Sequence, residues 1–424
     1  MLGSSGSLYA LLAPYFVAFT LFTKDRRFAR LCRARLADAP EHGPGEPFKI
    51  AHFTDTFHEI NGVARSIKSE LRLALEQDLD LRVITCGPEN EARGVTNFAP
   101  IGAYSLPEYP ELTLYYPPFL SMLNHCFEQE FTHIHSATPG PIGLAALGIA
   151  KVLKLPIAGT YHTALPQYVA ELTGDAALEE GMWKYMCWYY GQMDVIYVPS
   201  KATGQELVDK GIEAKKIRTY PRGVNTERFH PAKRNGFFGR HGLGDGLKFL
   251  YVGRISREKD LNVLAAAFRD LARTRPDVHL VVVGDGPYLE EMRRELAGTP
   301  TLFTGYLTGE DLAQAYASCD VFVFPSTTDT FGNVVLEAQA SGLPVIVSDV
   351  GGPQENVLDG ETGLIAAGRD AQAFCRAMRR LADDPALLAA MRRAARTYME
   401  GRSFKSAFAE TWQIYRESHA GAGT

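Results

Sequence analysis

The chain alternates between short runs that are almost wholly apolar and longer stretches in which apolar positions recur with helical spacing. A typical pair is the run 321–324 (VFVF), which ends at Pro325, and the amphipathic stretch that leads from there to Gly342. Short apolar runs are typical of strands buried on both faces, and the stretches between them supply the covering helices. The pattern therefore predicts an α/β protein with parallel sheets.

The expected strands fall into an N-terminal and a C-terminal group. The first comprises 48–53, 79–85, 132–135, 156–163 and 194–200, and the second 248–252, 278–287, 321–324, 344–352 and 363–366. Between them, residues 236–246 are rich in glycine and positive charge and are interpreted as a hinge. Because 424 residues are too many for one hydrophobic core, we expect two domains.

Composition and charge exclude several classes of protein. A content of 46% hydrophobic and 22% charged residues is typical of a soluble globular protein. The net charge of −5 argues against a general nucleic-acid binder. The six cysteines are scattered and form no CxxC pair, so we expect neither a disulfide framework nor a zinc site, and a reducing cytoplasm is the simplest location.

The N-terminal stretch 8–23 is almost wholly apolar, and the basic run 24–35 follows it. It is shorter than the roughly 20 residues that a spanning helix needs, and it contains Pro14. Two interpretations stay open: a peripheral anchor that contacts an anionic membrane through residues 8–35, or a helix that packs on the protein itself or on a partner. The proline- and glycine-containing residues 37–46 predict a linker.

The segment 321–342 carries the strongest candidate chemistry. A buried strand that feeds a helix through a glycine-containing turn makes an anion site, because the first N–H groups of the helix are unpaired and its dipole adds about half a positive charge. Asp329 precedes the turn, and Glu337 lies eight positions later. A phosphate on the N–H groups, with a carboxylate on each side for sugar hydroxyls, would suit a nucleotide sugar.

The text of this segment, DTFGNVVLEAQASGLPV, resembles the retaining glycosyltransferases of family 4. Asp329 and Glu337 match the family's motif of an acidic residue, seven residues and Glu, with Asp in place of the usual first Glu. The resemblance implies the GT-B fold, in which two Rossmann-like, doubly wound parallel-sheet domains face a central cleft. It implies an acceptor-side domain at 47–235, a nucleotide-sugar domain at 246–400, and a C-terminal helix within 401–424 that crosses back to the first domain. The resemblance does not cover residues 1–46, which we interpret as an N-terminal hydrophobic and basic extension with a linker.

The resemblance also implies roles for individual residues. Arg254 and Lys259 would stabilise the charge of the leaving diphosphate, which fixed cations can do without a metal. His162 would lie beside the donor sugar, although Ala164 replaces an Asp that family members often have nearby. The expected catalytic residues are His162, Asp329, Lys259 and Arg254; the expected donor-binding residues are Asn61, Gly62, Gly253, Arg254, Lys259, Gly284, Asp329, Phe331, Gly332, Asn333, Val334 and Glu337.

These roles imply a hexosyltransferase that moves a hexose from a nucleotide-diphosphate sugar to a lipid or glycan acceptor, with retained configuration and without a metal or other cofactor. The wording TDTFGNVVLEA and FHEINGVA resembles members that make mannosylated, glucosylated or sulfoquinovosylated lipids. GDP-mannose is therefore the first expected donor, with UDP-glucose or UDP-sulfoquinovose as alternatives. A nucleotide-sugar epimerase or a phosphorylase of GT-B fold is the alternative from another class. The expected location is cytoplasmic, peripheral on the inner face of the membrane.

Aromatic residues are dense in the segment 182–193 (MWKYMCWYYGQM), where Trp183, Cys187 and Tyr190 share one face of a predicted helix. One interpretation is an apolar groove for the acceptor, and the other is an aromatic core helix. The sequence leaves both open.

Overall fold

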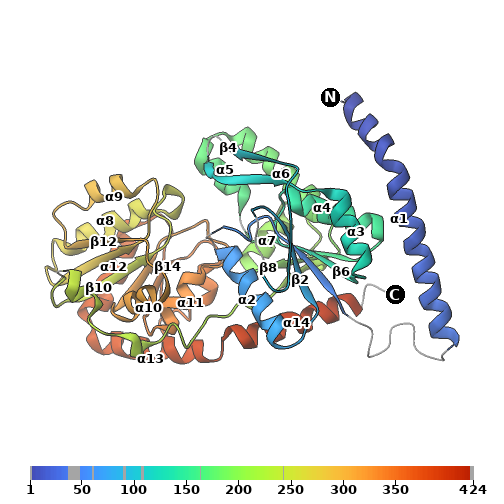
Figure 1. Cartoon of the computed structure of the whole chain (residues 1–424). Coiled ribbons are helices and arrows are strands. Elements are labelled where there is room, and N and C mark those ends of the chain that lie inside the picture. The colour runs from blue at the N-terminus through green and yellow to red at the C-terminus, as the bar shows by residue number, and fades with distance from the viewer. Residues whose placement is uncertain are drawn as a thin grey trace.

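The computed structural model describes residues 2–36, 48–59, 62–88, 92–106, 109–162, 164–241 and 243–420. They form two sheet units that lie side by side, with a long N-terminal helix along the outer side of the first unit (Figure 1). The predicted linker 37–46 lies outside the described residues.

The first unit contains a seven-stranded sheet in the order β3-β2-β1-β6-β7-β8-β9, in which all neighbours are parallel. Its strands are β1 (Ile50–Phe53), β2 (Leu81–Cys86), β3 (Val95–Phe98), β6 (His133–Ser136), β7 (Ile157–Thr160), β8 (Val195–Val198) and β9 (Ile217–Thr219). An antiparallel pair, β4 (Gly102–Leu106) and β5 (Tyr109–Tyr116), is inserted after β3. The helices are α2 (Gly62–Glu76), α3 (Phe119–Glu128), α4 (Pro141–Leu153), α5 (Leu165–Thr173), α6 (Ala176–Gly191) and α7 (Lys201–Asp209).

The second unit contains a six-stranded parallel sheet in the order β12-β11-β10-β13-β14-β15. Its strands are β10 (Leu247–Val252), β11 (Val278–Val283), β12 (Thr301–Gly305), β13 (Val321–Phe324), β14 (Val345–Ser348) and β15 (Gly363–Ala366). The helices are α8 (Leu261–Ala272), α9 (Leu289–Glu295), α10 (Gly309–Ala317), α11 (Asn333–Ala340), α12 (Ala371–Asp383) and α13 (Pro385–Glu400). Short 3-10 turns include η4 (Arg257–Lys259) and η5 (Pro353–Asn356).

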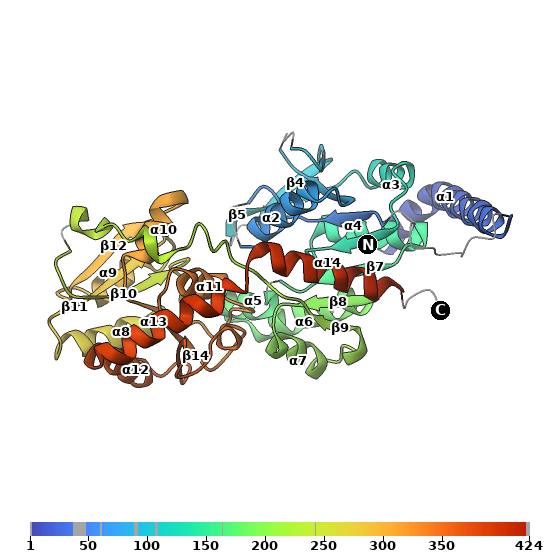
Figure 2. The same ribbon diagram turned by 90° about the horizontal axis from the view of Figure 1, so that it is seen from below.

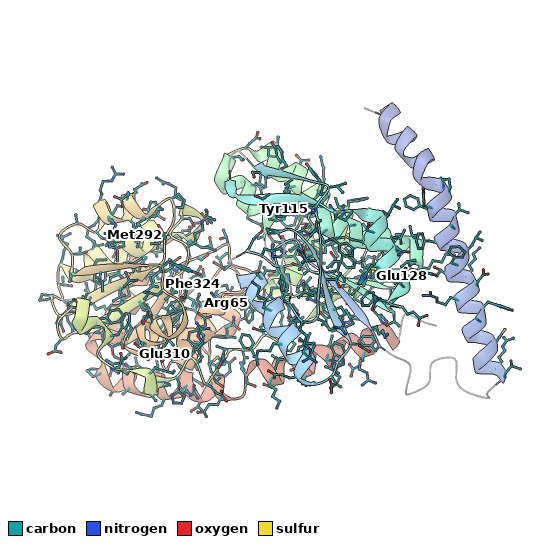
Figure 3. The ribbon with its side chains drawn as sticks, viewed as in Figure 1. Arg65, Tyr115, Glu128, Met292, Glu310 and Phe324 are labelled. Carbon is teal, nitrogen blue, oxygen red and sulfur yellow. The ribbon has the colours of Figure 1, made fainter. Side chains whose placement is uncertain are left out.

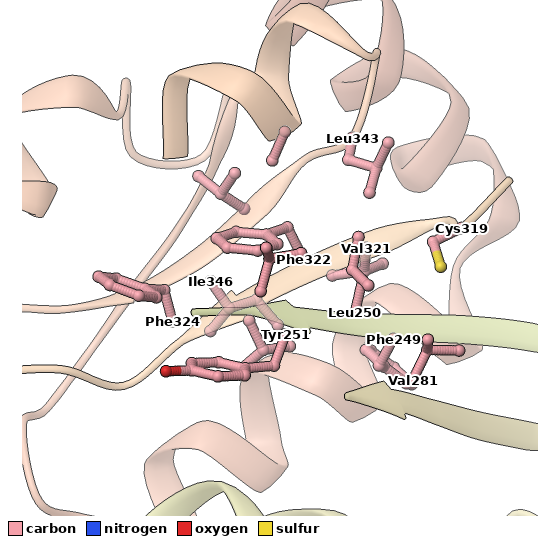
Figure 4. Packing of buried hydrophobic residues seen from close by; sticks show 14 of the residues in the cluster. Phe249, Leu250, Tyr251, Val281, Cys319, Val321, Phe322, Phe324, Leu343 and Ile346 are labelled. Carbon is pink, nitrogen blue, oxygen red and sulfur yellow. The ribbon is translucent and has the colours of Figure 1, made fainter. Parts of the chain in front are cut away.

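The expected pair of parallel sheets in an α/β arrangement is confirmed, and burial explains why the apolar runs predicted it. Every residue of β13 and of β14 is buried, as a strand covered by helices on both faces requires. Side chains of β10, β13 and β14 meet in this core, among them Phe249, Phe322 and Ile346, which have no exposed surface (Figure 4). Side chains from three strands thus form one packed core, and the segment that carries Asp329 begins where β13 leaves this core.

The last helix, α14 (Phe404–Ala420), belongs spatially to the first unit although it follows the second in the chain (Figure 2). Its Phe408 is buried in a cluster with residues of α2 and β2, and its Tyr415 is buried against Tyr197 of β8. The chain therefore passes between the units twice, once before β10 and once after α13.

The N-terminal helix α1 (Leu2–Leu36) continues through Pro14 and packs on the first unit. The ring of Phe16 meets that of Phe119 edge-on at 5.9 Å, and Phe19 meets Phe127 of α3 at 5.5 Å.

Polar contacts add to this packing, because Arg26 donates to the backbone oxygen of Phe127 at 2.7 Å and lies over its ring. No helix among the described residues is both long and apolar enough to cross a membrane. α1 nevertheless has large apolar side chains that are exposed, namely Tyr15, Val17, Leu21, Phe22, Phe28 and Leu36. Of these, Phe22 also meets the ring of Phe127 at 6.2 Å.

The aromatic segment 182–193 forms the second half of α6 and the turn after it. Trp183, Tyr189 and Tyr190 are buried in the core of the first unit, and Trp188 is exposed. Most of the aromatic surface therefore packs within the protein, which favours the core-helix interpretation.

Candidate active site

The turn after β13 brings the chain into α11 as the sequence predicts. Gly332 stands at the helix N-cap with φ +78 and ψ +65, a left-handed conformation that glycine adopts without steric cost. A Cβ at this position would also come within 3.1 Å of the Pro353 ring. The tight turn therefore requires glycine, and it leaves the first N–H groups of α11 at the carboxyl edge of the sheet.

Two buried acidic residues of the neighbouring turn hold this segment in place. Asp260, which is 8% exposed, accepts hydrogen bonds from the backbone N–H of Thr327 at 2.9 Å and from its hydroxyl at 2.7 Å. The hydroxyl of Thr328 donates to the backbone oxygen of Glu258 at 2.8 Å. Charge-assisted bonds to a buried carboxylate are among the stronger ones in proteins, so the turns after β10 and β13 behave as one block.

Within this block, the structure brings together two residues that the sequence assigned to the donor. Lys259 Nζ lies 2.9 Å from Asp329 Oδ2, and the two side chains are 11% and 23% exposed. Arg254 lies in the same turn, directly after β10 and Gly253. The pair combines a cation suited to phosphate with a carboxylate suited to sugar hydroxyls.

The two glycines predicted near the nucleotide lie at adjacent strand ends. Gly253 donates its N–H to the oxygen of Val283, and Gly284 follows directly in the chain. Gly284 has φ +140, and a Cβ there would lie 1.9 Å from the Gly253 oxygen. Only glycine allows this close approach of backbone to backbone.

Glu337 is 6% exposed on α11 and already has two partners. The hydroxyl of Tyr316 donates to its Oε2 at 3.1 Å, and Arg65 Nη1 donates to its Oε1 at 3.2 Å. Arg65 belongs to α2 and lies on the side of the first unit that faces the second (Figure 3). This ion pair therefore crosses from the first unit to the second. Burial raises the pKa of the Glu337 carboxyl, and the charge of Arg65 opposes that rise.

The start of α2 also lies against the start of α11. A Cβ built on Gly62 would lie 3.4 Å from the side-chain nitrogen of Asn333. The structure therefore brings together the two helix N-termini that the sequence assigned to the diphosphate. Asn61, which was assigned with Gly62, lies outside the described residues.

His162 follows β7 and is held from two directions. The hydroxyl of Thr330, in the second unit, donates to its backbone oxygen at 2.8 Å. Arg222 Nη2 lies 2.6 Å from its Nδ1. Burial, then the charge of Arg222, holds the pKa of the His162 ring well below its usual range, so the ring is neutral.

The remaining expected contacts are less direct. Phe331 is 8% exposed and packs in the core of the second unit, with the Arg222 guanidinium 5.3 Å from its ring centre. Val334 is partly buried against the same core. These two side chains anchor the start of α11 in the core, and the backbone oxygen of Phe331 accepts a hydrogen bond from Asn356 Nδ2 at 2.8 Å.

Sequence reasoning did not single out Arg65, Arg222, Tyr316 or Thr330. Arg65 and Arg222 both lie inside stretches that resemble the family, NGVARS and PRGVN. A cation inside such a stretch could have indicated that these two residues belong to the site. Among the described residues, no group of three or more His, Cys, Asp or Glu side chains is arranged to hold a metal ion.

Comparison with known proteins shows the class to which this fold and site belong. Residues 60–228 match the profile of Glycosyltransferase Family 4, and residues 246–384 match that of Glycosyl transferases group 1. A crystal structure of Anabaena Alr3699/HepE in complex with UDP and glucose superimposes with a TM-score of 0.69 at 17% identity, over 87% of this chain and 99% of that one. The fold is therefore GT-B, as expected.

Curated relatives define the family. The sulfoquinovosyl transferase SQD2 of Arabidopsis thaliana is 32% identical over 91% of this chain and 76% of its own length. A GDP-mannose-dependent alpha-mannosyltransferase of Mycobacterium tuberculosis is 31% identical, with 75% of this chain and 83% of that protein covered. An alpha-monoglucosyldiacylglycerol synthase of Streptococcus pneumoniae is 30% identical over 70% of each.

The chain belongs to glycosyltransferase family 4, and it is an enzyme that uses a nucleotide sugar as donor. The relatives act in glycolipid synthesis or use GDP-mannose by their names, so the expected class of reaction is confirmed.

Proposed function

We propose that this enzyme is a retaining, metal-independent hexosyltransferase that moves mannose from GDP-mannose to a lipid or glycan acceptor. The observation that carries the proposal is the Lys259–Asp329 pair, 2.9 Å apart at the edge of the second sheet and beside the start of α11. One partner suits the diphosphate of the donor and the other suits the hexose, and their direct contact puts both groups at one place on the edge of the sheet.

The diphosphate would lie between Lys259, Arg254 and the N–H groups of 332–334, with Gly62 closing the site from the first unit. Leaving-group charge grows in the transition state, so fixed cations and helix dipoles stabilise it more than the ground state. Gly253 and Gly284 give the nucleotide a backbone surface without side chains. No metal is required for this arrangement, because the cations already present supply the charge.

Glu337 would accept hydrogen bonds from the ribose hydroxyls. Its Oε1 is bonded to Arg65 and its Oε2 to Tyr316. A carboxylate offers about four lone-pair sites, so it can keep these partners and still accept from a ribose. The proposal therefore needs no rearrangement of α11.

Asp329 would bind hydroxyls of the transferred hexose, and His162 would lie beside that sugar. We infer displacement on one face of the sugar, through an oxocarbenium-like state, in which the leaving phosphate takes the proton of the acceptor hydroxyl. This route retains the configuration of the anomeric carbon without a covalent intermediate on the protein.

The choice of donor and acceptor follows the relatives. A GDP-mannose enzyme and a diacylglycerol glucosyltransferase are both about equally similar to this chain, at 31% and 30% identity. UDP-glucose and UDP-sulfoquinovose are the alternatives, the second supported by the Arabidopsis relative. A thermal-shift screen with these donors ranks them, because a donor at a hundredfold excess over its Kd stabilises the fold by about 2.7 kcal/mol.

Sugar transfer tests the proposal itself. The enzyme is incubated with radiolabelled GDP-mannose and vesicles containing diacylglycerol, and the organic phase is analysed for a mannosylated lipid. Transfer of label to the lipid is the expected result. Isomerisation of the donor, or phosphorolysis of a glycan instead, would replace the proposal by the epimerase or phosphorylase alternative.

We further propose that α1 rests on an anionic membrane from the cytoplasmic side. One side of α1 packs on α3 and α4, and the other exposes Val17, Leu21 and Phe28 at 58%, 52% and 67%. The exposed cations Lys24 and Arg35 lie on the same helix, and each cation near an anionic surface adds roughly 1 kcal/mol of attraction. α1 can thus pack on the protein and contact a membrane at the same time, because the two contacts involve different sides of the helix.

The membrane proposal is tested with a double variant, Leu21→Glu with Phe28→Glu, and the matched control Ile101→Glu, whose side chain is 76% exposed elsewhere in the first unit. The double variant should lose co-sedimentation with vesicles of anionic phospholipid and keep its melting temperature. Equal sedimentation of all three proteins would refute the membrane contact.

A further inference from the structure

Arg222 occupies a central position between the two units, although it belongs to neither sheet. It lies in the connecting segment shortly after β9 and contacts both sides. Its Nη2 reaches His162 of the first unit at 2.6 Å, and its Nη1 reaches Asn333 Oδ1 of the second unit at 3.4 Å. Its guanidinium also lies 5.3 Å from the ring centre of Phe331.

Tyr220 fixes the orientation of this guanidinium. The Tyr220 hydroxyl accepts hydrogen bonds from Arg222 Nε at 3.0 Å and from Nη2 at 2.7 Å, and the side chain is 5% exposed. A planar group held by two adjacent donors has little freedom to rotate. Tyr220 therefore determines the direction of the Arg222 N–H that points to His162.

The contact with His162 determines where the imidazole carries its proton. A guanidinium has only donors, so His162 Nδ1 must be the acceptor in this contact and bears no hydrogen. A neutral ring carries one proton, and that proton must then be on Nε2. A doubly protonated ring would direct an N–H at a cation 2.6 Å away, which the contact excludes.

We propose that Arg222 is a positioning residue that holds His162 as the Nε2–H tautomer, and that its contacts with Asn333 and Phe331 link this arrangement to the second unit. The inference rests on the proposed place of His162 beside the donor sugar. In this tautomer, His162 offers one hydrogen bond to a sugar oxygen and no basic nitrogen toward it. His162 therefore orients the hexose and does not remove the proton of the acceptor.

The guanidinium of Arg222 is specific for this task. Nη2 carries two hydrogens, which serve His162 and Tyr220 at once, while Nη1 remains for Asn333. A lysine ammonium at the same place is a single point donor on a flexible stem and cannot bridge these partners in one plane. Arg222→Lys should therefore retain the charge and lose the alignment.

Nitrogen-15 NMR of ring-labelled histidine tests the inference without any substrate. The two-bond correlations of a histidine ring differ between the two neutral tautomers, and the signals of His162 among the eleven histidines are identified by their loss in His162→Gln. The wild type should show Nδ1 unprotonated and Nε2 protonated. A His162 signal with the proton on Nδ1 would overturn the inference at once.

The variants Arg222→Gln and Arg222→Lys should give averaged signals of both tautomers. The matched control is Arg218→Gln, since Arg218 is exposed and donates only to nearby backbone oxygens of Lys215 and Ile217. Unchanged His162 signals in Arg222→Gln would overturn the inference. If that variant does not fold, Tyr220→Phe replaces it, because it keeps the guanidinium and removes its orienting acceptor. For Tyr220→Phe we also expect His162 signals averaged over both tautomers. Unchanged His162 signals in this variant would overturn the inference.

Kinetics separate this inference from the proposed function. Misorientation of His162 should lower kcat by about tenfold or more in Arg222→Gln and change the donor KM by less, as is common when a partner that orients a functional side chain is removed. An altered tautomer with unchanged kcat would keep the structural link and refute the role of His162 beside the sugar. An unaltered tautomer refutes the link whichever donor the enzyme uses.

Discussion

Asp329 and Lys259 of the second sheet unit are held by contacts within that unit, whereas His162 and Arg65 of the first unit rely on contacts that reach beyond it. Asp260 and Glu258 bind the segment that carries Asp329, and Lys259 pairs with Asp329. All of these belong to the turns after β10 and β13. The Lys259–Asp329 part of the site is thus organised by hydrogen bonds within the second unit.

His162 and Arg65, in contrast, find their partners outside the first unit. His162 is held by Thr330 and by Arg222 of the connecting segment, and Arg65 pairs with Glu337. From this difference we infer that the pairing of Lys259 with Asp329 depends on the fold of the second unit alone, whereas the position of His162 depends on the contact between the two units. The donor needs an intact second unit, and the complete site needs the two units docked.

The largest expected effect comes from removing Lys259, whose contacts lie within the second unit. Lys259→Ala should lower kcat on the order of a hundredfold, because it removes a fixed charge that stabilises the leaving diphosphate. The donor KM should rise by less, since this charge matters most in the transition state. Steady-state kinetics check this, with Lys233→Ala as the control, since Lys233 pairs with Glu310 on the surface of the same unit.

A wild-type kcat in Lys259→Ala would show that this lysine only pairs with Asp329. The melting temperature of the variant is measured alongside, because Asp329 then loses its partner.

A smaller effect is expected from Glu337→Gln, which keeps the shape of the side chain and removes its charge. The ribose hydroxyls would lose a charge-assisted acceptor, a loss of about 1.5 to 3 kcal/mol in donor affinity. Calorimetric titration with the nucleoside diphosphate measures it, and Glu361→Gln, an exposed glutamate of the same unit, is the control. Unchanged affinity would remove Glu337 from the donor site.

The smallest effect should come from Arg65→Met, which breaks the cross-unit pair. Arg65 is half-exposed, so its pair with Glu337 is screened and donor affinity at neutral pH should change by less than about tenfold. The pH dependence sharpens the test. Burial raises the Glu337 pKa and Arg65 opposes that rise, so donor affinity should fall as the pH drops through the raised pKa.

In Arg65→Met this fall should begin at a higher pH, because the opposing charge is gone. Calorimetry at a series of pH values follows the shift, and Lys68→Met on the same helix is the matched control. A pH profile identical to that of the wild type would mean that Arg65 and Glu337 are not coupled in solution.

The sequence predicted the central strands of both sheets because burial on both faces leaves a continuous apolar run. It missed β3, β9 and β12, which lie at sheet edges and are partly or largely exposed, so that polar residues are tolerated in them. The pair β4 and β5 was also missed, since it lies outside both parallel sheets.

The site residues likewise fall into those that the sequence indicated and those that it did not. Asp329 and Glu337 were proposed from the strand–turn–helix pattern around them, and Lys259 from the resemblance to the family. Each of these signals lies in a short stretch of the chain. The partners of His162 and Glu337 could not be predicted, because Arg222 is 60 residues from His162 and Arg65 is 272 residues from Glu337. Contacts at such separations depend on how the two units dock, and no local pattern encodes that.

The stereochemistry of the transferred sugar tests the central claim most directly. The enzyme is given GDP-α-mannose and diacylglycerol vesicles in the presence of EDTA, and the anomeric configuration of the first-formed product is read by proton NMR. The account predicts an α-mannoside formed at the rate seen without chelator. A β-mannoside, or a reaction that stops until a divalent metal is restored, would contradict it.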